Sequence, residues 1–309
     1  MIHIILTALG PIVVGLSVGW ICGAFGYFQR DTAHVFADFV VKIALPFALF
    51  LAAATASPEV LFNADYALAL AVGLIVTFVV GFGASIWVFK HERRDAAMQA
   101  LSASFPDMAY CGPPVLLAVV GSSGLIAMVI GNLIYTVVVL PITMVLVAPK
   151  GQQGQHGMLK TVLKPIMQPL VILPVLGAIL AITGVKLPEI AQNSIDELGK
   201  TAGGVALFFL GLLLSGIKFQ INKEIVFNVF TKNILQGALI LGAGLALGLE
   251  GSILQAAFII GILPTATAVP ALAISNNVYT ETAAGTVLLS TLLSLVTITT
   301  GIYIAERLA

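Results

Sequence analysis

The sequence has few charged residues and almost no cysteine. Asp, Glu, Lys and Arg make up 9% of the 309 residues, hydrophobic residues make up 59%, and the mean hydropathy is +1.08. A soluble domain of this length needs more surface charge, because one core cannot bury so much apolar area. The composition therefore predicts an all-α polytopic membrane protein.

Several classes of protein are excluded by what is missing. The formal net charge is zero, and the most basic stretch is Lys90-His91-Glu92-Arg93-Arg94, so no nucleic-acid partner is expected. Cys22 and Cys111 are too few for a disulfide framework or a cysteine metal cluster. Neither a metal nor a cofactor is expected.

Motifs for intramembrane catalysis and for nucleotide binding are also missing. His91-Glu92 is followed by Arg93 rather than by the spacing of a zinc protease, and Asp107 has no second acidic residue at matching depth. We therefore expect a protein that is not an enzyme. Since a nucleotide-binding motif is missing, any transport should be driven by an ion or substrate gradient.

Ten apolar runs are long enough to predict membrane-spanning helices, which need about 20 residues each. They lie near 4–27, 34–56, 65–89, 95–121, 124–147, 165–185, 198–217, 228–249, 252–277 and 281–305. A polar linker over 148–164 divides them into five-helix halves, 1–147 and 165–309.

The distribution of Lys and Arg predicts the orientation. Ten of these residues fall on the side of the 148–164 linker and three on the other, which puts both termini outside the cytoplasm. The start of the chain lacks the basic region of a cleaved signal, so the first run is expected to be a retained helix. Since five is odd, the second half enters the membrane in the opposite sense, as in an inverted repeat.

Two proline-rich stretches interrupt the fourth helix of each half. Pro106 and Pro114 bound the first break, and Pro264 and Pro270 bound the second. Asp107 and Pro264 each lie about 18 Å along their helices, near the membrane midplane. Lipid cannot satisfy backbone groups that a break frees, so we expect the breaks of helices 4 and 9 to cross there and to form the substrate site.

Half-helices that begin at such a crossing direct free amides at it, which suits a carboxylate, and half-helices that end there present carbonyls, which suit a cation or a donor. Asp107 is the one acidic residue that we place near the membrane centre. Burial raises a carboxyl pKa, so we expect Asp107 to take up and release a proton during transport. The alternative is a structural role, in which Asp107 accepts hydrogen bonds from the unwound backbone.

Further candidates come from polar residues elsewhere in the predicted helices. Lys42 either binds an anionic substrate or pairs with Asp38 one turn earlier. Asn132 beside Gly131 is the best placed of the polar helix residues, most of which serve hydrogen bonds between helices. The predicted substrate-binding set is Asp107, Cys111, Gly112, Pro114, Asn132, Thr265, Thr267, Pro270 and Lys42.

Four strings spread along the chain resemble the auxin efflux carrier family, in particular its bacterial permeases for malonate and malate. They are Ala44-Leu45-Pro46, FPDMAYCGPP from Phe105, LFFLGLLL from Leu207 and LPTATAVPALAISNNV from Leu263. The resemblance implies ten helices, a crossover of helices 4 and 9, and a carboxylate substrate beside it. It also implies a homodimer formed through helices 1, 2, 6 and 7, in a bacterial inner membrane.

The resemblance has one informative departure, because family members often carry Asn where this chain has Asp107. The leading hypothesis is a secondary transporter of small carboxylates, with malonate or a related dicarboxylate as substrate and a proton or ion as the coupling species. One alternative is a sodium-coupled organic anion symporter of the bile-acid type, which sodium dependence would favour. A passive channel or sensor is the other, which saturable counterflow would distinguish.

Overall fold

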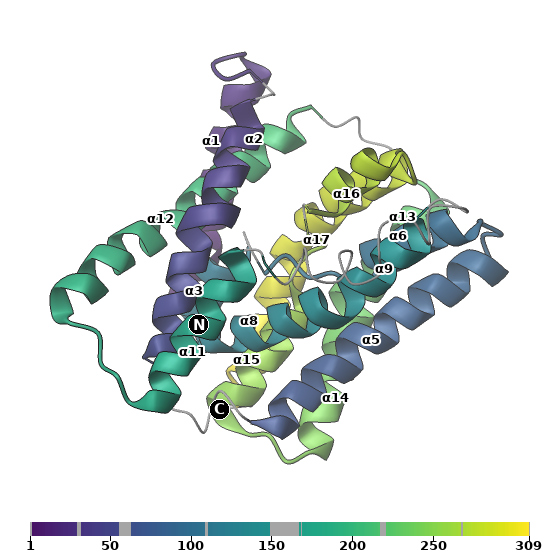
Figure 1. The fold of residues 1–309 in the computed structure, drawn as a ribbon. Coiled ribbons are helices and arrows are strands. Elements are labelled where there is room, and N and C mark those ends of the chain that lie inside the picture. Colours follow the sequence, from purple (N-terminus) through teal and green to yellow (C-terminus); the bar gives the residue numbers. More distant parts are fainter. Residues whose placement is uncertain are drawn as a thin grey trace. The chain divides into compact units, whose positions relative to one another are not determined.

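The computed structural model describes residues 2–29, 32–55, 63–108, 111–148, 167, 169–216, 221–266 and 268–308 (Figure 1). Secondary structure within these ranges is helical apart from one isolated β-bridge. The chain forms two compact units. Unit 1 contains residues 1–64, 108–130 and 168–217, and unit 2 contains residues 65–107, 131–167 and 218–309.

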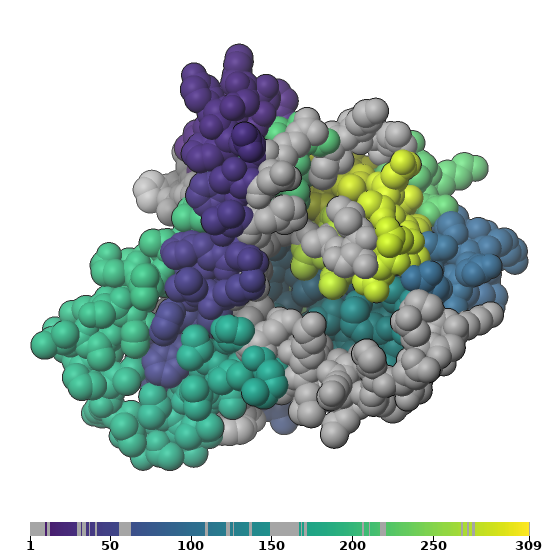
Figure 2. Space-filling model, turned by 45° about the horizontal axis from the view of Figure 1, so that its top comes forward, coloured from purple at the N-terminus to yellow at the C-terminus, as the bar shows by residue number. Residues whose placement is uncertain are grey.

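The elements of unit 1 are α1 (Ile2–Ala24), α2 (Thr32–Phe39), η1 (Val40–Ala44), α3 (Leu45–Ala54), α7 (Gly112–Val119), the first part of α8 (Ser122–Ile134), α11 (Pro169–Thr183) and α12 (Glu189–Leu214). Two pairs of these helices pack closely, α1 with α12 and α3 with α11. The N-terminal helices lie beside α12, as the purple and green residues of unit 1 show (Figure 2). A Cβ added at Gly19 would overlap the carbonyl of Phe208, so glycine permits the close approach of α1 and α12.

Unit 2 contains the segments on both sides of the second break and the residues before the first. Its elements are the rest of α8, α5 (Ala64–Trp87), α6 (Arg93–Ser102), η2 (Tyr135–Val139), α9 (Leu140–Val147), α13 (Lys223–Phe230), η3 (Thr231–Leu235), α14 (Gln236–Ala246), α15 (Gly251–Ile262), α16 (Ala268–Asn276) and α17 (Thr280–Ala305). α17 packs against α13, α15 and α16, and α14 packs against α15. Arg94 joins α6 to the ends of two helices, because its guanidinium donates to the carbonyls of Val147 and Asn276.

In the part of the chain that the structure describes, three helices contain a widened π-helical turn. η1 and η2 are each followed by a Leu-Pro pair, Leu45-Pro46 and Leu140-Pro141. Proline supplies no amide hydrogen and its ring collides with the preceding turn, so a wider turn there relieves both problems. No proline follows η3, where the corresponding residues are Gln236 and Gly237. The turn at η3 therefore needs another cause, and such turns often occur at functional sites.

Within the described residues, four helices are long and apolar enough to cross a membrane. They are Ala64–Trp87, Glu189–Leu214, Lys223–Ala246 and Thr280–Ala305, and shorter apolar helices include Val13–Ala24, Lys42–Ala54, Ile172–Thr183 and Gly251–Ile262. Helices occur in each of the ten ranges expected from the sequence, but ten crossings, the inverted repeat and the orientation stay predictions. The protein is a helical, multi-pass membrane protein.

One residue in the count of Lys and Arg was misplaced. Lys232 was one of the ten residues counted on the side of the 148–164 linker, but it lies in η3, inside a continuous helix from Lys223 to Ala246, and its side chain is buried. Tertiary packing decides this burial, so a count of charges does not show it.

The two units combine segments from both halves of the chain. Unit 1 contains the described helices in the regions expected as helices 1, 2, 6 and 7, and unit 2 contains those expected as helices 3, 8, 9 and 10. The same four helices of unit 1 are those that the family resemblance assigns to a dimer scaffold. The division into repeats 1–147 and 165–309, and the linker over 148–164, stay predictions; residues 149–164 lie outside the described residues.

Candidate functional site

The extended segments that follow α6 and α15 pair with each other inside unit 2. The amide of Asp107 donates to the carbonyl of Pro264 at 2.8 Å, and the amide of Ala266 donates to the carbonyl of Phe105 at 2.8 Å. Pro106 and Thr265 thus face each other in an isolated antiparallel bridge. The amides of Asp107 and Ala266 and the carbonyls of Pro264 and Phe105 therefore satisfy one another, as a low-dielectric environment requires.

The Thr265 side of this crossing is held by α17 and η3. The hydroxyl of Thr265 donates to the carbonyl of Ser102 at 3.0 Å, and its amide donates to the hydroxyl oxygen of Ser290 at 2.8 Å. Ser290 in turn donates to the amide oxygen of Asn233 at 2.6 Å. A continuous chain of hydrogen bonds therefore runs from the break to helix α17 and on to η3.

The Ser104 side is held by Gln236 and by an aromatic pair. The Gln236 amide nitrogen donates to the carbonyl of Ser104 at 2.7 Å and to the hydroxyl of Thr77 at 2.8 Å. The Ser104 hydroxyl lies 3.0 Å from the hydroxyl of Tyr135, and the ring of Phe105 stacks on Tyr135 with 3.9 Å between the centroids. These contacts order the chain directly before Asp107.

Two ionisable side chains are buried at the crossing. The side chains of Asp107 and Lys232 are both 0% exposed. The Lys232 amine nitrogen donates to the carbonyls of Leu263 at 2.7 Å and Gly261 at 3.1 Å. Ionisable residues inside a membrane protein are costly and often functional, so both residues are candidates for a role at the site.

The crossing brings together part of the predicted set. Asp107, Thr265, Pro106 and Pro264 meet at the bridge, whereas Pro270 is buried in α16. Asn132 belongs to unit 2 and is 8% exposed. Thr267 lies outside the described residues. None of these positions has a tested role in binding.

The other predicted residues belong to unit 1. Cys111 and Gly112 are buried where α7 begins, and Pro114 lines a cavity of about 520 Å³ together with residues of α3 and α12. Lys42 in η1 is exposed and pairs with Asp38 at 2.6 Å. The structure thus shows the ion pair that the sequence analysis gave as one of two interpretations of Lys42.

Sequence reasoning missed the contribution of η3 and its neighbours. Lys232, Asn233 and Gln236 each hold a different part of the crossing, and Ser290 links two of those parts. A signal was available, because a lysine, an asparagine and a glutamine within five residues of an apolar span are costly in a membrane and usually face the protein interior. The partner of each could not be predicted from that signal.

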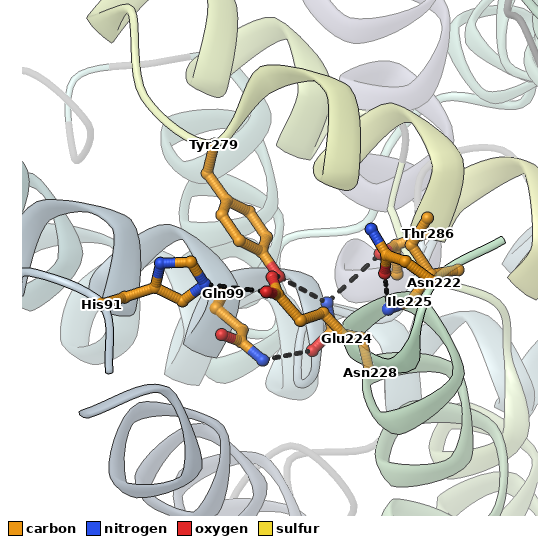
Figure 3. Close-up of polar contacts among 8 residues, drawn as sticks. All are labelled: His91, Gln99, Asn222, Glu224, Ile225, Asn228, Tyr279 and Thr286. Atoms are coloured by element: carbon orange, nitrogen blue, oxygen red, sulfur yellow. Dashed lines mark hydrogen bonds and ion pairs between the residues drawn. The ribbon is translucent and has the colours of Figure 1, made fainter. Parts of the chain in front are cut away.

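A second polar cluster joins the ends of helices in unit 2 (Figure 3). His91 lies 3.0 Å from one carboxylate oxygen of Glu224, and Tyr279 donates to the other at 2.9 Å. Asn228 donates to the Tyr279 and Thr286 hydroxyls and accepts from Gln99. Burial raises the pKa of the Tyr279 phenol above its usual range, so this hydroxyl remains a donor at neutral pH.

Paired, unwound segments inside a helical membrane protein are typical of membrane transporters. The chain belongs to the membrane transport protein family, whose sequence profile matches residues 4–302. It is similar to the transporter YfdV of Escherichia coli strain K12, with 34% identity over 306 residues covering 96% of each chain. It is also similar to a protein of Rhizobium meliloti named "Putative malonate transporter", with 28% identity over 276 residues that cover 86% of this chain and 85% of the relative.

These relationships confirm the resemblance to the auxin efflux carrier family that the four sequence strings indicated. The protein is therefore a membrane transporter.

Proposed function

We propose that the protein is a secondary active transporter of small organic carboxylates, with malonate or a related dicarboxylate as substrate. The observation that carries the proposal is the hydrogen-bonded crossing of the Asp107 and Pro264 segments. Unwound backbone at this depth is tolerated where it lines a protein cavity, and paired breaks of this kind bind substrate in transporters. The malonate assignment is supported by the name of the Rhizobium relative.

In this proposal the transporter works by alternating access, and the substrate binds beside the crossing. The proposed binding residues are those predicted from the sequence: Asp107, Cys111, Gly112, Pro114, Asn132, Thr265, Thr267, Pro270 and Lys42. Amides and hydroxyls are the donors that a carboxylate needs. The protein acts as a homodimer in the bacterial inner membrane, with both termini outside the cytoplasm.

Asp107 is the proposed proton site. An ionised Asp107 would repel a carboxylate substrate, whereas a protonated one can donate a hydrogen bond to it. Proton uptake at Asp107 would then accompany substrate binding and couple the two movements. Its side chain is completely buried, and removal of a carboxyl group from water disfavours the charged form, which supports such a cycle.

Counterflow of labelled malonate in proteoliposomes tests the function. Native protein is compared with Asp107→Asn and with Asp65→Asn, an exposed carboxyl at the start of α5, each at two pH values. We expect saturable exchange that unlabelled dicarboxylates inhibit, and a pH dependence that is lost in Asp107→Asn and kept in Asp65→Asn.

The other outcomes are equally informative. Absence of exchange with every short acid would remove the substrate assignment. A pH dependence that survives Asp107→Asn would remove the proton role of Asp107, and flux without saturation would indicate a channel.

A further inference from the structure

The carbonyl end of α15 lies at the crossing, and the Lys232 side chain donates hydrogen bonds to it. Helices end with carbonyls that have no partner in the helix, and the helix dipole gives this end a partial negative charge. Transporters with broken helices place coupling cations at such ends. In this chain Lys232 donates to two carbonyls there, those of Gly261 and Leu263.

The position of Lys232 is set by the packing of α14 on α15. A Cβ added at Gly261 would lie 2.7 Å from the Cα of Gly237, a distance that real Cβ atoms do not show. The two backbones therefore touch where both residues are glycine. This approach brings η3 beside the last turn of α15, within reach of a lysine ammonium.

The neighbours of Lys232 hold η3 in place from two other directions. Asn233 donates to the carbonyl of Ser290 at 3.0 Å and accepts from the Ser290 hydroxyl, while Gln236 donates to the carbonyl of Ser104. The Lys232 side chain is completely buried, so its ammonium does not reach out to a polar boundary, as lysines near helix ends usually do. It is an internal charge with a fixed place.

We propose that the Lys232 ammonium is a built-in cation of this transporter, which occupies the carbonyl end of α15 and excludes Na⁺ or another monovalent metal cation from it. The carbonyls of Gly261 and Leu263 lie at the negative end of the α15 helix dipole, where a cation or a donor is favoured. A tethered ammonium group fills this place without an ion from solution. Resting on the proposed function, the inference assigns coupling to the proton on Asp107 rather than to sodium.

A purely structural role predicts different behaviour when the ammonium is removed. If Lys232 merely fastens η3 to α15, its loss destabilises the protein whatever salt is present. If it takes the place of a bound cation, its loss leaves the carbonyls of Gly261 and Leu263 without their donor, and a small cation stabilises the variant by binding there.

Thermal unfolding of the purified protein separates these cases. Native protein, Lys232→Ala and Lys223→Ala are compared in sodium chloride and in choline chloride at equal ionic strength; Lys223 is an exposed lysine at the start of α13 in the same long helix. We expect a lowered midpoint for Lys232→Ala in choline, and a saturable rise of about 2–5 °C as sodium replaces choline. The native protein and Lys223→Ala should show no such difference.

Two results overturn the inference. One is a Lys232→Ala protein that is folded and unresponsive to sodium, and the other is a sodium response of equal size in native protein and variant. Lys232→Gln, which keeps a hydrogen-bond donor without the charge, replaces Lys232→Ala if the latter does not fold. If neither folds, equilibrium binding of radioactive sodium to native protein decides, since saturable binding of one ion per chain contradicts a built-in cation.

These measurements require no transported substrate. A failure of malonate counterflow would therefore contradict the proposed function and leave the cation inference standing, whereas an absent sodium response in the Lys232 variants would contradict the inference alone.

Discussion

Pro106 and Thr265 face each other in an antiparallel bridge, although they belong to opposite halves of the sequence. The residues on either side close the bridge with two hydrogen bonds of 2.8 Å, and side chains of α14 and α17 bind the same segments. Each break is thus stabilised by the other. Substitutions in the surrounding helices should disturb the crossing even when they touch neither proline.

Ser290 provides the first test of this arrangement. Ser290→Ala leaves the Thr265 amide and the Asn233 amide oxygen without their shared partner, so we expect a loss of about 1–3 kcal/mol in the free energy of unfolding. Ser294, one turn further along α17, is also buried but donates to the carbonyl of Thr291 in its own helix. Ser294→Ala should cost below about 0.5 kcal/mol, because that carbonyl lies within the helix ladder. Equal losses in a denaturation experiment would contradict the role of Ser290.

Gln236 is expected to contribute more than Gln255 to the free energy of unfolding. Gln236→Leu removes both donors to the Ser104 carbonyl and the Thr77 hydroxyl, and should lower the free energy of unfolding by about 1–3 kcal/mol. Gln255→Leu, which loses one bond to the carbonyl of Ala305, is the matched control and should be milder. A Gln236→Leu protein as stable as Gln255→Leu would show that the Ser104 carbonyl finds another partner.

The contact between Gly237 and Gly261 predicts an unusual cost for alanine. Gly261→Ala places a Cβ against the Gly237 backbone, so α14 and α15 must separate, at about 1–3 kcal/mol. Gly242 in α14 has open space around its Cα, and Gly242→Ala should be neutral or stabilising by up to about 1 kcal/mol. Thermal unfolding midpoints of the two variants should therefore move in opposite directions or differ clearly; equal midpoints would argue against the close contact.

Alkaline pH should weaken the cluster around Tyr279. Burial raises the pKa of this phenol in the folded protein above its unfolded value near 10, so the folded state retains a proton that the unfolded state loses. The stability that Tyr279 contributes is present below about pH 10 and decreases as the pH rises further. Unfolding midpoints measured between about pH 8 and pH 11 should decline less steeply for Tyr279→Phe than for the native protein. A steeper decline in the variant would reverse the sign of this contribution.

The composition and the positions of the prolines made much of the architecture predictable. Long apolar runs indicate helices wherever they occur, and Pro106, Pro114, Pro264 and Pro270 mark breaks because proline removes a backbone donor. The equal depth of Asp107 and Pro264 followed from the rise per residue, and in the structure the two are joined by a hydrogen bond. These features are local, so each can be recognised from a few neighbouring residues.

The partners at the crossing were decided by tertiary packing. The π-helical turn at η3 has no proline to announce it, and the place of Lys232 depends on contact between Gly237 and Gly261 and on bonds from Asn233 and Gln236. These are contacts between separate helices, and a hydrophobic pattern does not encode how one helix is rotated against another. The sequence therefore revealed that the membrane segments break and where, whereas the close approach of two helices determined which side chain reaches the end of α15.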